Sequence, residues 1–73
     1  MTSAIDQELS ELRGEIAQRQ RHIEDRLALI EVLEHDGHDV FEQQTALKES
    51  RSRLATQIAR QFELLRKQSR TAG

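Results

Sequence analysis

The chain of 73 residues contains no cysteine, proline, tryptophan or tyrosine, and only two phenylalanines. Without cysteine, neither a disulfide framework nor a cysteine-ligated metal site can form. The longest unbroken apolar run, residues 27–30, is far too short to cross a bilayer. The N-terminus lacks the basic start and apolar run of a signal peptide. These absences predict a cytoplasmic protein that makes no contact with a membrane.

The residues that are abundant favour helix. Charged residues make up 33% of the chain and hydrophobic residues 36%, with alanine, glutamate, leucine, arginine and glutamine the commonest types. Such a composition is typical of long helices and coiled coils. The length predicts a single domain, residues 1–73. A scaffold of this size without disulfides or metal usually needs further stabilisation, often by oligomerisation.

The middle of the chain carries the signals of a tight turn. Gly37 follows an apolar period that ends at Leu33, and glycine takes a positive φ angle without a steric clash. His38 comes next in the chain, and the following helix is expected to begin directly after it. We therefore predict a turn over residues 36–38 that joins two antiparallel helices.

Two helices flank this turn, the first over about residues 4–35 and the second over about residues 39–68, followed by a frayed tail at residues 69–73. Ser3 or Thr2 can cap the first helix. Asp39 is expected to cap the second helix, and Glu42, three residues later, completes an acidic variant of the capping box.

Apolar residues recur along both halves with alternating spacings of four and three, which predicts a heptad seam on each helix. On the first helix the expected seam is Ile5, Leu9, Leu12, Ile16, Ile23, Leu27, Ile30 and Leu33, with Arg19 where an apolar residue is due and Arg26 beside Leu27. On the second helix it is Val40, Leu47, Leu54, Ile58, Phe62 and Leu65, with Gln44 and Arg51 as polar members.

One alignment of the two helices places the apolar residues of both seams opposite each other. In this register the numbers of facing residues sum to about 77. This register predicts the apolar pairs Ile30–Leu47 and Ile23–Leu54 and the charge pairs Glu24–Arg53 and Glu11–Arg66. Charge supports the pairing, because residues 1–37 hold nine acids and four bases, a net charge of −5, whereas residues 38–73 hold four acids and seven bases, a net charge of +3. The fold class is therefore all-α, an antiparallel two-helix hairpin that resembles a coiled coil.

The half of the hairpin near the turn has more apolar surface than one partner helix can bury. Leu29 and Val32 point away from the expected seam, and Val40 and Phe41 begin the second helix on adjacent faces. We predict that this surface pairs two hairpins into a dimeric four-helix bundle. The predicted interface consists of Leu27, Leu29, Val32, Leu33, Val40 and Phe41.

Part of the chain resembles a group of small bacterial helical proteins, often found in alphaproteobacteria. The resemblance rests on Leu29, Ile30 and Leu33, then the turn Gly37-His38-Asp39, then Leu47. It covers less than half of the chain, and Val40 and Gln43 depart from the group's usual pattern. The group has no assigned catalytic residues, so the resemblance implies a bacterial helical hairpin and no particular activity.

Two clusters of side chains offer other functions. His35, Asp36, His38 and Asp39 at the turn are all possible metal ligands, but zinc needs three or four converging ligands and side chains in a tight turn splay apart. We therefore favour solvent-exposed turn residues and predict no metal and no cofactor. The second helix is basic and could contact phosphates through Arg51, Arg53, Arg60, Arg66, Lys67 and Arg70.

For nucleic-acid binding the chain lacks an aromatic stacking platform and a helix-turn-helix of normal proportions, so we favour a solvated basic face. A hairpin also offers no deep pocket in which catalytic groups could converge away from water. The sequence thus predicts a non-catalytic protein–protein interaction module, a small adaptor or regulator that binds itself and an unknown protein. A nucleic-acid-associated regulator is the alternative.

Overall fold

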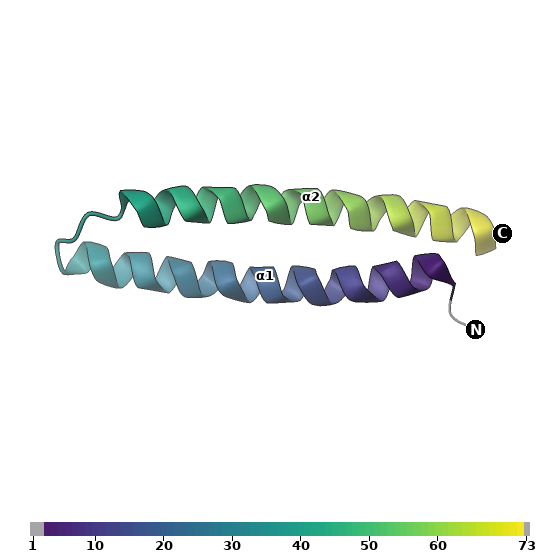
Figure 1. Ribbon diagram of the computed structural model, residues 1–73, viewed down its shortest axis with the longest axis horizontal. Helices are drawn as coiled ribbons and strands as arrows, with labels where there is room; N and C mark the ends of the chain where they lie inside the picture. The colour runs from purple at the N-terminus through teal and green to yellow at the C-terminus, as the bar shows by residue number, and fades with distance from the viewer. Residues whose placement is uncertain (1–2, 73) are drawn as a thin grey trace.

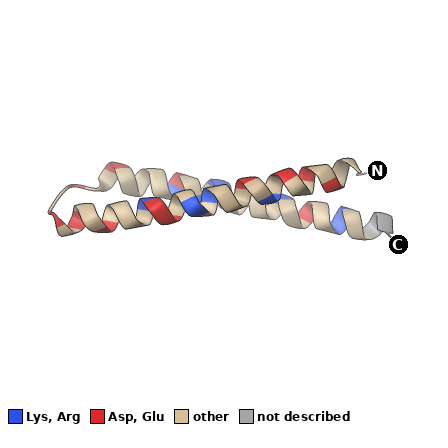
Figure 2. Cartoon of the chain, turned by 90° about the horizontal axis from the view of Figure 1, so that it is seen from below, with Lys and Arg blue, Asp and Glu red and all other residues tan. Residues whose placement is uncertain are grey.

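The computed structural model describes residues 3–72 of the chain, with side chains for residues 3–69. Two helices of 32 residues each, α1 (Ala4–His35) and α2 (Phe41–Ala72), lie side by side and antiparallel (Figure 1). They form a rod with principal extents of 56 × 18 × 13 Å. Seen edge-on, the helices cross at a shallow angle, as coiled-coil partners do (Figure 2). The predicted all-α antiparallel hairpin is confirmed.

The bounds of α1 match the sequence prediction, and those of α2 are shifted. Ser3 caps α1 by accepting a hydrogen bond from the N–H of Asp6 at 3.1 Å. The second helix begins at Phe41 and continues to Ala72, beyond the predicted end at residue 68. Residues 69–72, predicted as a frayed tail, are thus helical, and Gly73 lies outside the described residues.

The turn ends α1 with a Schellman motif. Gly37 has the positive φ angle expected of it, 81°. The N–H of Gly37 donates to the carbonyl of Glu34 at 3.0 Å, and the N–H of His38 donates to the carbonyl of Leu33 at 2.9 Å. These two bonds satisfy carbonyls that the last turn of α1 would otherwise leave unpaired.

Gly37→Val should lower the free energy of unfolding by about 1–2 kcal/mol, because a β-branched residue is strained at positive φ. No heavy atom lies within 4 Å of the position that a Cβ would occupy, so the expected loss is conformational rather than a clash. Gly37→Asn is the matched control and should cost less. Urea unfolding of the two variants tests this prediction, and equal stability of valine and glycine proteins would contradict it.

The start of α2 differs in detail from the predicted capping box. The first helical hydrogen bond, from the N–H of Gln44, is accepted by the carbonyl of Val40 at 2.9 Å, so Val40 occupies the cap position. Asp39 lies one residue earlier, and its carboxylate accepts the N–H of Phe41 at 3.0 Å in an Asx turn. In the described part of the chain, Glu42 makes no return bond to the backbone of Asp39.

Asp39→Ala should destabilise the hairpin by about 1 kcal/mol, because it leaves the N–H of Phe41 without its side-chain acceptor. Asp39→Asn keeps an acceptor oxygen in the same place, so the loss of stability should be small. Thermal unfolding followed by circular dichroism distinguishes the two. Equal losses from alanine and asparagine would show that the carboxylate charge, rather than the hydrogen bond, is needed.

The buried side of α1 follows the predicted heptad with one correction. Ile5, Leu9, Leu12, Ile16, Ile23, Ile30 and Leu33 are buried or half-buried, and so are the polar seam members Arg19 and Arg26. Leu27, which was predicted in the seam, is exposed, because Arg26 occupies the seam position beside it. The stem of an arginine can cover apolar surface while its head reaches solvent.

The buried side of α2 was predicted in part: Val40, Leu47 and Leu54 are in the seam as predicted, and the other predicted members are not. The seam that keeps strict three–four spacing consists of Val40, Gln43, Leu47, Ser50, Leu54, Gln57, Gln61, Leu64 and Gln68, all buried or half-buried. Gln44 and Arg51 are exposed, and Phe62 is 64% exposed. Leu64, absent from the predicted seam, is the most deeply buried side chain at 1%. Ile58 and Leu65 flank this seam and are half-buried.

Each seam residue of α1 faces a seam residue of α2 when the two residue numbers sum to 73, rather than to the predicted 77. Leu33 then faces Val40 across the turn, and the heptads of both helices run in step from this pair. The predicted ion pairs Glu24–Arg53 and Glu11–Arg66 do not form among the described residues.

The core consists of two apolar clusters separated by a polar layer. One cluster, towards the open end, contains Leu9, Leu12, Ile16 and Leu64, and the other, towards the turn, contains Ile23, Ile30, Val40 and Leu47. Leu54 packs against both clusters. Between them, Nε of Arg19 donates to Oε1 of Gln57 at 2.8 Å. With glutamines and a serine in the α2 seam, the hairpin has a thin core for its length.

Candidate interaction surfaces

Bonds across the helix pair show which flanking residues share a side of the rod. Gln44 of α2 donates to Glu34 of α1 at 3.3 Å, so these two residues lie on one side. Residues seven apart lie on the same face of a coiled-coil helix. Leu27 precedes Glu34 by seven residues, and Ile58 follows Gln44 by fourteen.

The same spacing adds further apolar residues to this side. Leu65 follows Ile58 by seven residues and therefore lies on the same side. Phe41 precedes Gln44 by three residues, and Phe62 precedes Leu65 by three. The two phenylalanines thus share one heptad position, at the outer edge of this side. We call this the Phe62 side and define it by Leu27, Phe41, Ile58, Phe62 and Leu65. Phe41 and Phe62 are 71% and 64% exposed, so large aromatic rings stand in solvent here.

The opposite side is polar. Arg60 of α2 donates to both carboxylate oxygens of Glu8 of α1, at 3.1 and 3.3 Å, and it also contacts Glu63 at 3.2 Å. Glu63 in turn contacts Lys67 at 3.6 Å. Glu15, His22 and Leu29 follow Glu8 at successive heptad spacings. We call this the Arg60 side and define it by Glu8, Glu15, His22, Leu29 and Arg60.

Hydrogen bonds and charges within this ion-pair network shift the pKa values of two groups. The hydrogen bond to Glu8, helped by that to Glu63, raises the pKa of the Arg60 guanidinium above its ordinary value. The hydrogen bond from Arg60 and the charge of Lys67 lower the pKa of the Glu63 carboxyl. Both groups are solvent-exposed, so the network orients the helices more than it stabilises them.

Lowering the pH should weaken the hairpin through Glu63. The pKa of the Glu63 carboxyl is lower in the folded state than its ordinary value of 4.5. The ionised carboxylate therefore contributes fully to the free energy of unfolding above pH 4.5, and this contribution is lost as the pH falls through the folded-state pKa. We expect the thermal midpoint to fall as the pH drops below about 4.5, and to fall less in Glu63→Gln. Melting curves in this pH range test the difference, and identical slopes would contradict it.

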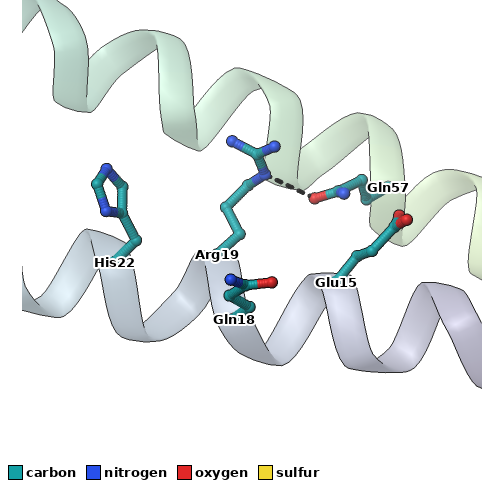
Figure 3. Close-up of a pocket in the computed structure, with 5 residues that line it drawn as sticks. All are labelled: Glu15, Gln18, Arg19, His22 and Gln57. Atoms are coloured by element: carbon teal, nitrogen blue, oxygen red, sulfur yellow. Dashed lines mark hydrogen bonds between the residues drawn. The ribbon is translucent and has the colours of Figure 1, made fainter.

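A polar recess of about 500 Å³ opens on the Arg60 side beside the polar layer. Figure 3 shows Arg19 reaching from α1 to Gln57 of α2, with Glu15, Gln18 and His22 around it. Glu15, Gln18 and His22 are exposed, so the recess is open to water, whereas Arg19 and Gln57 are half-buried. No nucleophile lies among these five residues with a base to activate it. The recess therefore explains how a charged layer is solvated within the seam.

The structure divides the predicted interface into three groups. Leu33 and Val40 pack inside the hairpin and are not available to a partner. Leu27 and Phe41 lie on the Phe62 side. Leu29 lies on the Arg60 side, and Val32, 58% exposed, lies beyond Leu29 on the outer edge of that side. Sequence reasoning missed Phe62 as a surface residue because it was assigned to the seam.

The predicted turn residues Gly37, His38, Asp39 and Glu42 are all exposed. His35 contacts Asp36 at 3.6 Å in solvent. Within the part of the chain whose side chains are described, no three histidine, aspartate or glutamate side chains converge to hold a metal ion. A shallow depression of about 260 Å³ beside the turn is lined by Glu31, Val32, His35 and Asp36.

Charge differs along the rod and between its sides. Residues 27–47 hold no lysine or arginine, whereas basic residues gather over the middle of the rod (Figure 2). Among helical residues with described side chains, the Phe62 side and its outer edge carry four acids and three bases, a net charge of −1: Asp6, Glu24, Glu31, Glu34, Arg13, Lys48 and Arg51. The Arg60 side and its outer edge carry seven acids and three bases, a net charge of −4: Glu8, Glu11, Glu15, Asp25, Glu42, Glu49, Glu63, Arg53, Arg60 and Lys67.

The basic residues of α2 therefore do not form one face. Lys48 and Arg51 lie on one side, and Arg53 and Arg60 on the other. Arg60 is also paired with acids. Phosphate contacts by a rigid helix need bases on a common face, and the three that share one, Arg53, Arg60 and Lys67, lie on the side that also carries seven acids.

Comparisons with known proteins add no assignment. No protein-family model, no curated protein and no solved structure matches the chain. The resemblance to bacterial hairpin proteins therefore stays a prediction that rests on the turn residues. Over the described residues, neither helix has a stretch apolar enough to cross a membrane.

Proposed function

We propose that the protein is a non-catalytic protein–protein interaction module, a small cytoplasmic adaptor or regulator whose hairpins self-associate into a dimeric four-helix bundle. The observation that carries this proposal is the exposure of Phe41 and Phe62, the only aromatic residues in the chain. A small hairpin with a thin core gains little from holding both of its aromatic rings in solvent. A partner surface that covers them gives both rings an apolar environment.

The expected energies are consistent with association. Burying an exposed leucine or phenylalanine side chain stabilises by roughly 1.5–3 kcal/mol, and a two-fold dimer buries each residue twice. The entropic cost of association is about 4–15 kcal/mol. Three such residues per copy lie on the Phe62 side, and covering them in both copies contributes up to about 9–18 kcal/mol, which is comparable with or larger than this cost.

Sedimentation equilibrium tests the proposal. At tens of micromolar the protein should have twice the chain mass of 8.5 kDa. A well-folded monomer under these conditions would contradict self-association and leave the apolar residues as a docking surface for a different protein.

A gel-shift titration across salt concentrations tests the nucleic-acid alternative. We expect no shift at physiological salt, because the bases of α2 are divided between two sides of the rod. A shift that weakens steeply with salt would favour the alternative over the interaction module.

A further inference from the structure

We infer that the Phe62 side is the self-association surface and that its occupant is a second copy of this chain. The inference rests on the proposed function and adds to it the face that is covered. It also replaces the interface predicted near the turn with one that extends along most of α2.

The distribution of apolar residues favours this side. Leu27, Phe41 and Phe62 are large, exposed and on the Phe62 side, and Ile58 and Leu65 are half-buried beside them. Leu29 and Val32 are the large exposed hydrophobics that remain, and both lie on the opposite side. One flat contact can cover residues on one side of a two-helix rod but not on both. A contact through the Phe62 side covers more apolar surface, including both aromatic rings.

Charge favours a second copy on this side. Two Phe62 sides meet with a net charge of −1 each, whereas two Arg60 sides would meet with −4 each. On the Phe62 side the bases of α2, Lys48 and Arg51, face outward without an acid on the same helix face, and the acids Glu24 and Glu31 occupy α1. With Asp6, Glu34 and Arg13 also on α1, the α1 part of this side has a net charge of −3 and the α2 part +2, which suits a self-complementary contact in which α1 of each copy meets α2 of the other.

The broad face of the rod is large enough. A face of 56 Å by 18 Å projects about 1,000 Å², which exceeds the roughly 800 Å² per partner of a standard stable interface. Both helices lie in this face (Figure 1). A second hairpin packed on it therefore completes a four-helix bundle.

Matched charge substitutions on the two sides test the inference. Phe62→Glu introduces a carboxylate on the Phe62 side, and Val32→Glu introduces one on the other side at a residue of similar exposure, 64% against 58%. Both residues stand in solvent within the hairpin, so both variants should keep their helical circular dichroism. Sedimentation equilibrium then gives the dissociation constant of the dimer for each variant and for the wild type.

Phe62→Glu should weaken the dimer at least about tenfold, because each dimer loses two buried rings and gains two buried charges. Val32→Glu should leave the dissociation constant within about twofold. If Phe62→Glu loses helicity, Phe41→Glu on the same side carries the test. A dimer that is weakened by Val32→Glu and not by Phe62→Glu would overturn the inference while leaving the proposed function intact. A wild-type monomer would overturn both.

Discussion

Leu64→Ala should lower the free energy of unfolding by about 2–4 kcal/mol, which is a large part of what a two-helix hairpin can have. Leu64 is 1% exposed and packs with Leu9, Leu12 and Ile16 in the cluster towards the open end. Removing its side chain both loses apolar burial and leaves a cavity in a thin core. The hairpin should therefore fray from its open end.

Urea unfolding at low micromolar concentration, with Leu29→Ala as the control, tests this expectation. Leu29 has the same side chain but is exposed on the Arg60 side, so its truncation should change stability by under about 0.5 kcal/mol. The contrast tests the register directly. Equal losses from the two substitutions would show that Leu64 does not face α1.

Replacing the polar layer with leucines, in the double variant Arg19→Leu with Gln57→Leu, should raise the free energy of unfolding by about 1–3 kcal/mol. The two apolar clusters, which Leu54 already bridges, would then form a seam without the polar Arg19–Gln57 pair that now lies between them. Polar seam residues usually cost stability and define register and oligomeric state. We therefore expect the double variant to melt higher and also to form larger assemblies.

The single variants provide the control for this prediction. Gln57→Leu alone removes the acceptor of the Arg19 Nε–H bond and leaves a half-buried guanidinium unpaired, so it should be less stable than the double variant. Melting temperature and light scattering measure the two effects. A double variant less stable than the wild type would show that the Arg19–Gln57 bond stabilises the hairpin in its own right.

The turn and the first helix could be predicted because their signals are local. Gly37 at the end of an apolar period specifies a left-handed residue whatever lies elsewhere in the chain. The seam of α1 was also predictable, since it has an apolar residue at nearly every heptad position. The exception is the pair Arg26 and Leu27. The apolar Leu27 was assigned to the seam, but the seam position belongs to Arg26.

The seam of α2 could not be predicted in the same way, because α2 carries two competing apolar stripes. Over residues 54–68, Ile58, Phe62 and Leu65 form one, and Leu54 and Leu64 belong to another whose other positions in this range are glutamines. Hydrophobicity alone favours the first stripe. The packing of Leu33 against Val40 at the turn fixes the second, since the heptads of both helices continue from that pair. Packing across the turn, rather than the hydrophobicity of α2 alone, decides which stripe faces α1.

This difference also explains why the predicted interface did not include Phe62. The sequence pattern placed Phe62 in the core, whereas its side chain is exposed. Because Leu64 rather than Phe62 occupies the seam, Phe62 and Phe41, which share one heptad position, both stand in solvent on one side of the rod. Val40 and Leu47 of the apolar pattern of α2 belong to the hairpin's own core, and Phe62 is left in solvent, where the proposed self-association would cover it.

The most direct test of self-association through this face is an isotope-filtered nuclear Overhauser experiment on a mixture of labelled and unlabelled protein. Phe41 and Phe62 are the only phenylalanines and the chain has no tyrosine or tryptophan, so once the ring protons of the three histidines are assigned the remaining aromatic signals belong to these two residues. The account predicts contacts between these rings and methyl groups of the other copy. A sample that sediments as a dimer but shows intermolecular contacts only to the methyl groups of Leu29 and Val32, and none from either ring, would contradict it.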